Sequence, residues 1–223
     1  MTDLAFYFDP VCPFAWLTSK WVRVVQARRG YDVDWRTISL RILNGHVDYD
    51  AQFPPDYEAG HTAGLRLLRL VHAARAERGP EVSGPLYEAL GRRIFDGEPI
   101  EDRVADGVDV RGTAGFVAPV LDELGLPAGL AERLDDESLD LDIRTETDEA
   151  LALTGKDVGT PIIHFRPPDG VAFFGPVISR LPEEEDALRL WDHVAALAEF
   201  PGFSELKRSL RERPQLRALG WQD

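Results

Sequence analysis

The sequence predicts an α/β protein in which a small mixed sheet is interrupted by a long helical segment. Strand-like segments cluster toward the two ends of the chain, at residues 4–8 and 31–40 and again at 161–165 and 171–174. Between about residues 60 and 153, apolar residues instead recur at helical spacing with almost no strand signal. The chain has 223 residues, 44% of them hydrophobic, which is ample for a packed core.

The N-terminal part predicts a strand, a helix and a second strand. Residues 4–8, Leu-Ala-Phe-Tyr-Phe, form a short apolar run that an Asp-Pro pair ends. After Pro13 no proline or glycine occurs until Gly30, which is placed as a helix C-cap would be. Residues 31–40 then alternate apolar and polar side chains, which indicates a half-buried strand.

The middle of the chain predicts a series of helices. Their apolar residues recur at three- and four-residue steps, and glycine follows several of them. The predicted helices cover residues 61–78, 85–94, 113–124, 128–134 and 145–154.

Strand character returns in the C-terminal part. The Pro-Pro-Asp-Gly segment between the strands at 161–165 and 171–174 predicts a hairpin with a loop longer than two residues. A helix is expected over residues 182–200, with three glutamates in its first turn, where the helix dipole favours anions. Residues 202–213 are basic, and we expect them to form a helical tail.

This order of elements describes a thioredoxin fold with a helical insertion. A parallel strand–helix–strand half precedes the insertion, and an antiparallel hairpin followed by a helix completes the sheet. We expect residues 1–55 and 155–223 to form a discontinuous thioredoxin-like domain and residues 56–154 an inserted helical domain. On the pattern alone, another α/β fold stays open.

Composition narrows the classes of partner. Lys and Arg number 25 against 39 Asp and Glu, for a net charge of −14. Such a surface repels nucleic acid and anionic membranes, and it serves solubility. No stretch approaches the roughly 20 apolar residues of a membrane span, and the N-terminus lacks the pattern of a secretory signal. One cysteine excludes an internal disulfide, and the five histidines show no metal-ligand spacing. We therefore expect a cytoplasmic protein without a metal.

The single cysteine, Cys12, lies where the first strand passes into the first helix. Pro13 suits the first helical position, because the N–H that it lacks would be unpaired there. Free backbone N–H groups and the helix dipole favour a thiolate at this position. The alternative is inert packing, since cysteine is among the most buried residue types. Asp9 would either tune the thiol, disfavouring the thiolate by repulsion, or cap the turn.

A second notable element is Thr160-Pro161, directly before the apolar run at residues 162–165. On local sequence alone, a trans-proline that opens a strand is expected. In a thioredoxin-like fold this proline would instead be cis and packed against Cys12. The tryptophans are more often core residues than the walls of a substrate slot: Trp16, Trp21 and Trp35.

Residues 8–16, Phe-Asp-Pro-Val-Cys-Pro-Phe-Ala-Trp, resemble the active-site junction of the DsbA family. More narrowly, they are similar to the actinobacterial mycothiol-dependent nitroreductase family, whose pattern is FDP-x-CPWCW. The likeness continues in order along nearly the whole chain, and the helical middle matches weakly. The FFGPV-x-SR stretch is its most specific part. The further matching segments are residues 39–44, 157–161, 171–180 and 203–208.

One position departs from the family pattern. Ala15 stands where the family has its second cysteine, and the chain has no other thiol. A dithiol–disulfide cycle within the molecule is therefore excluded. Monothiol chemistry remains, in which Cys12 forms a mixed disulfide with a low-molecular-weight thiol and an external thiol resolves it. The nitroreductase activity of the family is not carried over.

The resemblance implies roles for the residues around the thiol. Cys12 would be the nucleophile and Pro13 the helix starter. Phe14 would be the exposed residue that tunes access. Thr160 and cis-Pro161 would form the edge on which a substrate docks.

The resemblance also implies a site for a thiol cofactor, either mycothiol or a glutathione-like compound. Arg180 would suit its carboxylate, because a guanidinium binds that group with two hydrogen bonds. An equally weighted alternative is a surface ion pair of Arg180 with Glu183 or Glu184. The residues expected to hold the charged end of the cofactor are Gly175, Pro176, Ser179 and Arg180.

Three functions compete. The first is a thiol-dependent oxidoreductase or transferase that uses Cys12 covalently, with a small-molecule thiol and a flat apolar compound as partners. The second is an isomerase or kappa-class transferase that binds the cofactor thiol without a covalent bond. The third is a non-catalytic binding protein derived from a redox ancestor. A homodimer is left open, and neither nucleic acid nor membrane is expected.

Overall fold

The computed structural model describes residues 2–155, 157–209 and 212–221, and it has a four-stranded sheet with the order β2-β1-β5-β6. Strand β1 pairs in parallel with β2 and antiparallel with β5, and β5 pairs antiparallel with β6. The sheet and the helices around it confirm the predicted α/β class. The strands are β1 (Leu4–Phe8), β2 (Val33–Thr37), β5 (Ile162–Phe165) and β6 (Ala172–Phe174).

Strand β1 lies in the interior of the sheet, and all of its residues are buried. Because successive side chains of a strand point to opposite faces, its apolar run supplies two layers. Phe6 and Phe8 enter the main core, whereas Ala5 and Tyr7 enter a smaller cluster on the other face. A continuous apolar run is what a strand covered on both faces requires.

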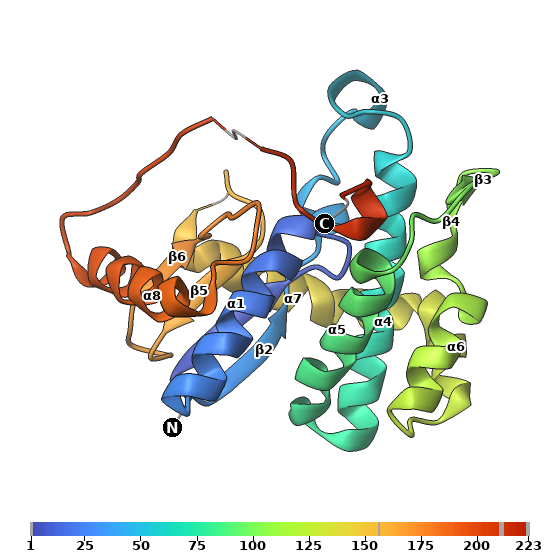
Figure 1. The fold of residues 1–223 in the computed structure, drawn as a ribbon. Helices are drawn as coiled ribbons and strands as arrows, with labels where there is room; N and C mark the ends of the chain where they lie inside the picture. Colours follow the sequence, from blue (N-terminus) through green and yellow to red (C-terminus); the bar gives the residue numbers. More distant parts are fainter. Residues whose placement is uncertain (1, 156, 210–211, 222–223) are drawn as a thin grey trace.

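Helix α1 (Pro13–Arg29) connects β1 to β2 and ends at Gly30. Gly30 adopts a left-handed conformation with φ 69°, and its N–H donates to the Gln26 carbonyl, as in a helix C-cap. Helix α8 (Glu184–Glu199) packs beside α1 (Figure 1). The indole N–H of Trp21 donates to the carbonyl of Ala187 at 2.9 Å, which joins the two helices.

The segment between β2 and β5 is mostly helical, and its side chains share the main core with the sheet and α1. In Figure 1 three of these helices, α4 (Tyr57–Arg78), α5 (Ser83–Gly91) and α6 (Ala114–Glu123), lie on the opposite side of α1 from α8. A small hairpin of β3 (Val104–Ala105) and β4 (Val108–Asp109) interrupts them. The sequence pattern did not predict this hairpin, because each strand has only two residues. The helices are α2 (Leu40–Leu43), α3 (Tyr49–Gln52), α4 (Tyr57–Arg78), α5 (Ser83–Gly91), α6 (Ala114–Glu123) and α7 (Asp140–Thr154).

Several predicted helices differ from the structure at their ends. A π-helical turn at Arg92–Asp96 follows α5, and Ala128–Asp135 forms 3-10 turns rather than an α-helix. Helix α7 begins at Asp140, not at residue 145, because its first turn alternates acidic and apolar residues and so shows no helical apolar period. Its acidic start suits the positive end of the helix dipole.

The predicted helical tail over residues 202–213 is wrong for residues 202–209, which form no helix. Leu206 is 80% exposed, so a helix there would bury no apolar face, and short helices are marginal without one. Residues 210 and 211 lie outside the described part. The chain then forms one 3-10 turn at Arg217–Leu219.

A buried carboxylate fastens the helical segment to the sheet. Glu146 of α7 accepts hydrogen bonds from the Thr37 N–H at 3.0 Å and from Arg36 and Arg75, both at 2.9 Å. Burial alone would raise the pKa of Glu146, but contacts with His72 and Arg75 bring it well below its ordinary value. Glu146 therefore links β2, α4 and α7 as a charged group.

Candidate active site around Cys12

Cys12 is the N-cap residue of α1, at the junction that the sequence predicted. Its Sγ accepts a hydrogen bond from the Ala15 N–H at 3.4 Å. The same sulfur lies 3.5 Å from the carbonyl oxygen of Thr160, to which its S–H donates. The fold therefore brings together two segments that are 148 residues apart in the chain.

The Cys12 thiol is buried, with 6% of the residue exposed. Burial raises the pKa of Cys12 to about 12; the N–H of Ala15 works against this rise, and the charge of Asp9 adds to it. The backbone N–H groups at the start of α1 thus lower the pKa of Cys12, as expected, but by less than desolvation raises it. The expectation of an exposed, reachable thiolate is wrong for this closed structure.

Asp9 shapes the loop between β1 and α1. Its Oδ1 accepts a hydrogen bond from the Val11 N–H at 3.0 Å, and its Oδ2 accepts one from the Leu40 N–H at 2.8 Å. Burial raises the pKa of Asp9 to about 6. Helix α4 approaches so closely that a Cβ on Gly64 would lie 2.7 Å from Asp9 Oδ1. Asp9 therefore stabilises the turn between β1 and α1 through backbone hydrogen bonds, and its charge opposes a thiolate at Cys12.

The Thr160-Pro161 peptide bond is cis, and this segment faces Cys12. The Thr160 hydroxyl donates to the Tyr7 carbonyl at 2.9 Å, which fixes the segment against β1. The Pro161 carbonyl accepts from the Gly175 N–H at 2.8 Å. The Thr160 carbonyl is thereby left directed at the Cys12 thiol.

The segment predicted to hold a thiol cofactor, residues 175–180, follows β6. The hydroxyl of Thr18 donates to the carbonyl of Pro176 at 2.7 Å, which places Pro176 beside α1. Ser179 and Arg180 lie farther along, and Arg180 is 67% exposed in its side chain. The structure thus brings the start of this segment to α1 and leaves the Arg180 side chain in solvent.

Two expectations about side chains near the site need correction. Phe14 is half-buried rather than exposed, because its side chain packs against the main core. The alternative expectation for Arg180, a surface ion pair with Glu183 or Glu184, is not found among the described residues. Arg180 Nε lies 3.8 Å from Glu212, whereas Glu184 pairs with Arg28.

Sequence reasoning missed Tyr87, which lies under the active-site junction. Its ring stacks on Phe8 at 3.8 Å between centroids and meets the edge of Trp16 at 5.8 Å. The residue is fully buried, and within the described residues its hydroxyl has no hydrogen-bond partner. Burial raises the pKa of Tyr87 well above its ordinary value. The sequence carries no signal for Tyr87 beyond its place in a predicted helix, because the contacts that set it apart are with residues distant in the chain.

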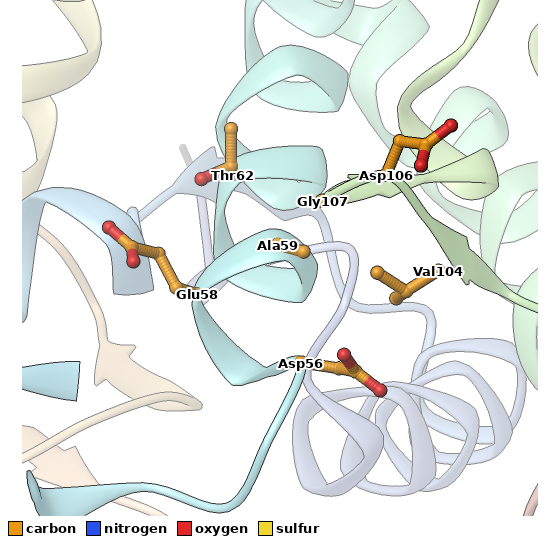
Figure 2. Close-up of a pocket in the computed structure, with 7 residues that line it drawn as sticks. All are labelled: Asp56, Glu58, Ala59, Thr62, Val104, Asp106 and Gly107. Atoms are coloured by element: carbon orange, nitrogen blue, oxygen red, sulfur yellow. The ribbon is translucent and has the colours of Figure 1, made fainter. Parts of the chain in front are cut away.

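The surface has a hollow of about 520 Å³ away from the predicted site. It lies between the first turns of α4 and the β3–β4 hairpin, and Figure 2 shows its carboxylates. A second hollow of about 380 Å³ lies between the end of α5 and α6. Neither is lined by a residue that the sequence assigned to the site. The first is lined by Asp56, Glu58, Ala59, Thr62, Val104, Asp106 and Gly107.

Within residues 2–155, 157–209 and 212–221, no group of three or more His, Cys, Asp or Glu side chains is arranged to hold a metal ion. In the same described part of the chain, no helix has both the length and the apolar character needed to cross a membrane.

The strand order, with Cys12 and Pro161 facing each other, is that of a DsbA-like thioredoxin fold. The cytosolic disulfide reductase DsbM from Pseudomonas aeruginosa superposes with a TM-score of 0.52 at 19% identity, over 87% of this chain and 99% of that one. A 2-hydroxychromene-2-carboxylate isomerase gives a TM-score of 0.53 at 13% identity, over 87% and 95%. At these identities the likeness confirms the fold.

Residues 11–208 match the Rv2466c-like family model, described as mycothiol-dependent nitroreductase Rv2466c, and the chain belongs to this family. A relative is the uncharacterized protein Rv2286c of Mycobacterium tuberculosis (strain ATCC 25618 / H37Rv). It is 30% identical over 214 residues, which cover 93% of this chain and 82% of the relative. Family membership supports a thiol-dependent redox function.

Proposed function

We propose that this chain is a cytosolic monothiol oxidoreductase or transferase in which Cys12 exchanges disulfides with a low-molecular-weight thiol such as mycothiol. One observation carries the proposal: the only thiol of the chain caps α1 and lies 3.5 Å from the carbonyl that precedes cis-Pro161. Membership of a family described by a mycothiol-dependent activity supports the choice of cofactor. A cytosolic location fits, because that compartment keeps its thiols reduced.

The absence of a second thiol fixes the form of the reaction. Ala15 offers only its N–H to the Cys12 sulfur. In the first step Cys12 loses its proton, and its sulfur attacks a disulfide R–S–S–R′. The Cys12–S–S–R bond forms, the S–S bond of the substrate breaks, and R′S⁻ leaves and takes up a proton. A thiol RSH then attacks the sulfur of the bound RS group, so that R–S–S–R is released and Cys12 is regenerated.

The burial of Cys12 in this structure favours its protonated form. Since burial is the main cause of its raised pKa, the first step requires that the thiol become more exposed. Once solvated, the same sulfur would feel mainly the Ala15 N–H and the end of the α1 dipole, which favour a thiolate. We therefore assign reactivity to an opened form of the site.

Binding would use the segment that follows β6. Gly175, Pro176, Ser179 and Arg180 are proposed to hold the charged end of the cofactor, with Arg180 on a carboxylate. Phe174 and Val177 are 38% and 43% exposed on either side of the Gly175-Pro176 peptide. These apolar side chains support a flat apolar compound as the second substrate.

One observation favours a second candidate, the isomerase or kappa-class type of enzyme. A cysteine with a raised pKa stays an S–H donor at neutral pH. In that role Cys12 would donate a hydrogen bond to the sulfur of a bound cofactor thiolate without forming a covalent bond.

Trapping a mixed disulfide separates these candidates. The purified chain is incubated with mycothiol disulfide or glutathione disulfide, and its intact mass is measured. Covalent exchange predicts one added thiol group per chain, and Cys12→Ser is the control that adds none. If the wild-type chain gains no mass while it binds S-methyl mycothiol, the non-covalent candidate replaces the covalent one. If it neither gains mass nor binds, the binding-protein alternative is favoured.

A further inference from the structure

The last described residues, 212–221, return to the body of the protein and pack on it; we refer to them as the C-terminal strap. Leu216 is only 3% exposed and belongs to the main core. The Gln215 N–H donates to the Ser179 carbonyl at 2.7 Å. The 3-10 turn at Arg217–Leu219 packs against the π-helical turn at Arg92–Asp96. The strap therefore connects the segment after β6 with the inserted helices.

The two segments that hold the strap, residues 175–180 and Arg92–Asp96, are each hydrogen-bonded to the first half of α1. On one side the Thr18 hydroxyl donates to the Pro176 carbonyl at 2.7 Å. On the other side Asp96 accepts from the Trp16 indole at 3.0 Å and from Lys20 at 2.8 Å. The strap therefore connects two segments that are each hydrogen-bonded to the first half of α1, the helix that Cys12 caps.

The strap also occupies groups that the proposed function assigns to the cofactor. Glu212 lies 3.8 Å from the Arg180 guanidinium, which is the group expected to bind a carboxylate of the thiol. The neighbouring Ser179 carbonyl is already bonded to Gln215. Because both side chains of the ion pair are exposed, it is weak and easily replaced. A carboxylate-bearing ligand would therefore compete with Glu212 for the same partner.

We propose that the C-terminal strap holds the Cys12 site closed, and that a carboxylate-bearing low-molecular-weight thiol displaces it from residues 175–180 in order to bind. This inference rests on the proposed function, because it names the step that precedes exchange at Cys12. The ligand shifts the equilibrium because it binds only the form in which the strap is released. Release also exposes the thiol, so binding and activation occur together.

The test measures the access of Cys12 to a small reagent, without any exchange partner. Rates of alkylation by iodoacetamide at pH 8.5 are compared for the wild type, Leu216→Ala and a chain that ends at residue 209. Leu130→Ala is the matched control: Leu130 is as buried as Leu216, and its 3-10 segment packs on α4. Both substitutions remove the same core side chain and destabilise the fold to a similar degree, but only Leu216→Ala loosens the strap.

Loss of the strap anchor is expected to raise the alkylation rate of Leu216→Ala by at least about tenfold, because it weakens the closed form. Leu130→Ala is expected to stay near the wild-type rate. Equal acceleration in the two variants would show that general destabilisation exposes Cys12, and this would overturn the inference. If Leu216→Ala is alkylated faster but forms no mixed disulfide, the inference about the strap is supported and the proposed exchange is refuted.

Discussion

The protonation of Cys12 can be tested through the pH dependence of its alkylation. Burial moves the pKa of this thiol from 9.0 to about 12, a difference of three units. At neutral pH this lowers the thiolate population about a thousandfold relative to an unperturbed cysteine. Since the thiolate is the nucleophile, native Cys12 should react about a thousandfold more slowly than the same residue in the unfolded chain.

The assay is unambiguous because no other thiol competes. Rates with iodoacetamide are measured from pH 6 to 10, on the native chain and in denaturant. The native rate should rise about tenfold per pH unit without a plateau, whereas the denatured rate levels off near the ordinary cysteine pKa. A native plateau below pH 8 would refute the assignment of a protonated resting thiol. The raised pKa also means that the stability contribution of Cys12 is complete below pH 9 and declines as the pH rises toward 12.

Three further predictions follow from particular contacts. Ala15→Cys places a second thiol next to the Cys12 sulfur, so mild oxidation should block alkylation of both cysteines and dithiothreitol should restore it. If the oxidised variant is still alkylated, residues 12 and 15 are not close enough for a disulfide. Glu146→Gln should destabilise the fold by about 3 kcal/mol at pH 7, because two arginines lose their carboxylate. Folding lowers the pKa of Glu146, so its stabilisation is complete above its unfolded pKa and is lost as the pH falls toward the folded pKa. The difference in melting temperature between the wild type and this variant should therefore be larger at pH 7 than at about pH 2. Tyr87→Phe should melt at or above the wild-type temperature, since its buried hydroxyl has no partner in the described structure; a clear loss of stability would mean that the hydroxyl is bonded.

The elements around the site were predictable because their signals are local. The apolar run of β1 and the Pro13-to-Gly30 span of α1 need no tertiary information. The placement of Cys12 between them follows directly. The facing position of Pro161 was reached only through the resemblance, since local sequence favoured a trans-proline.

What the sequence could not reveal depends on contacts between distant segments. The burial of Cys12 arises from groups such as Tyr87 on α5 and the Thr160 carbonyl, and no local pattern reports them. The return of Leu216 to the core is another example, because a few apolar residues between Pro214 and Gly220 are too short a pattern to carry a periodic signal. The expectation of a thiolate at Cys12 was wrong for the same reason. The helix N-terminus can be predicted from the sequence, whereas desolvation depends on the folded molecule.

In the proposed cycle Cys12 turns over without a second cysteine, because an external thiol releases it, and this release step can be measured directly. The chain carrying one mycothiol on Cys12 is isolated, mixed with free mycothiol, and followed by intact mass and by the disulfide released. The adduct is expected to disappear, one mycothiol disulfide should appear for each chain, and Cys12 should again be open to alkylation. An adduct that persists would contradict the account, because Cys12 would then be a site of modification and not of catalysis.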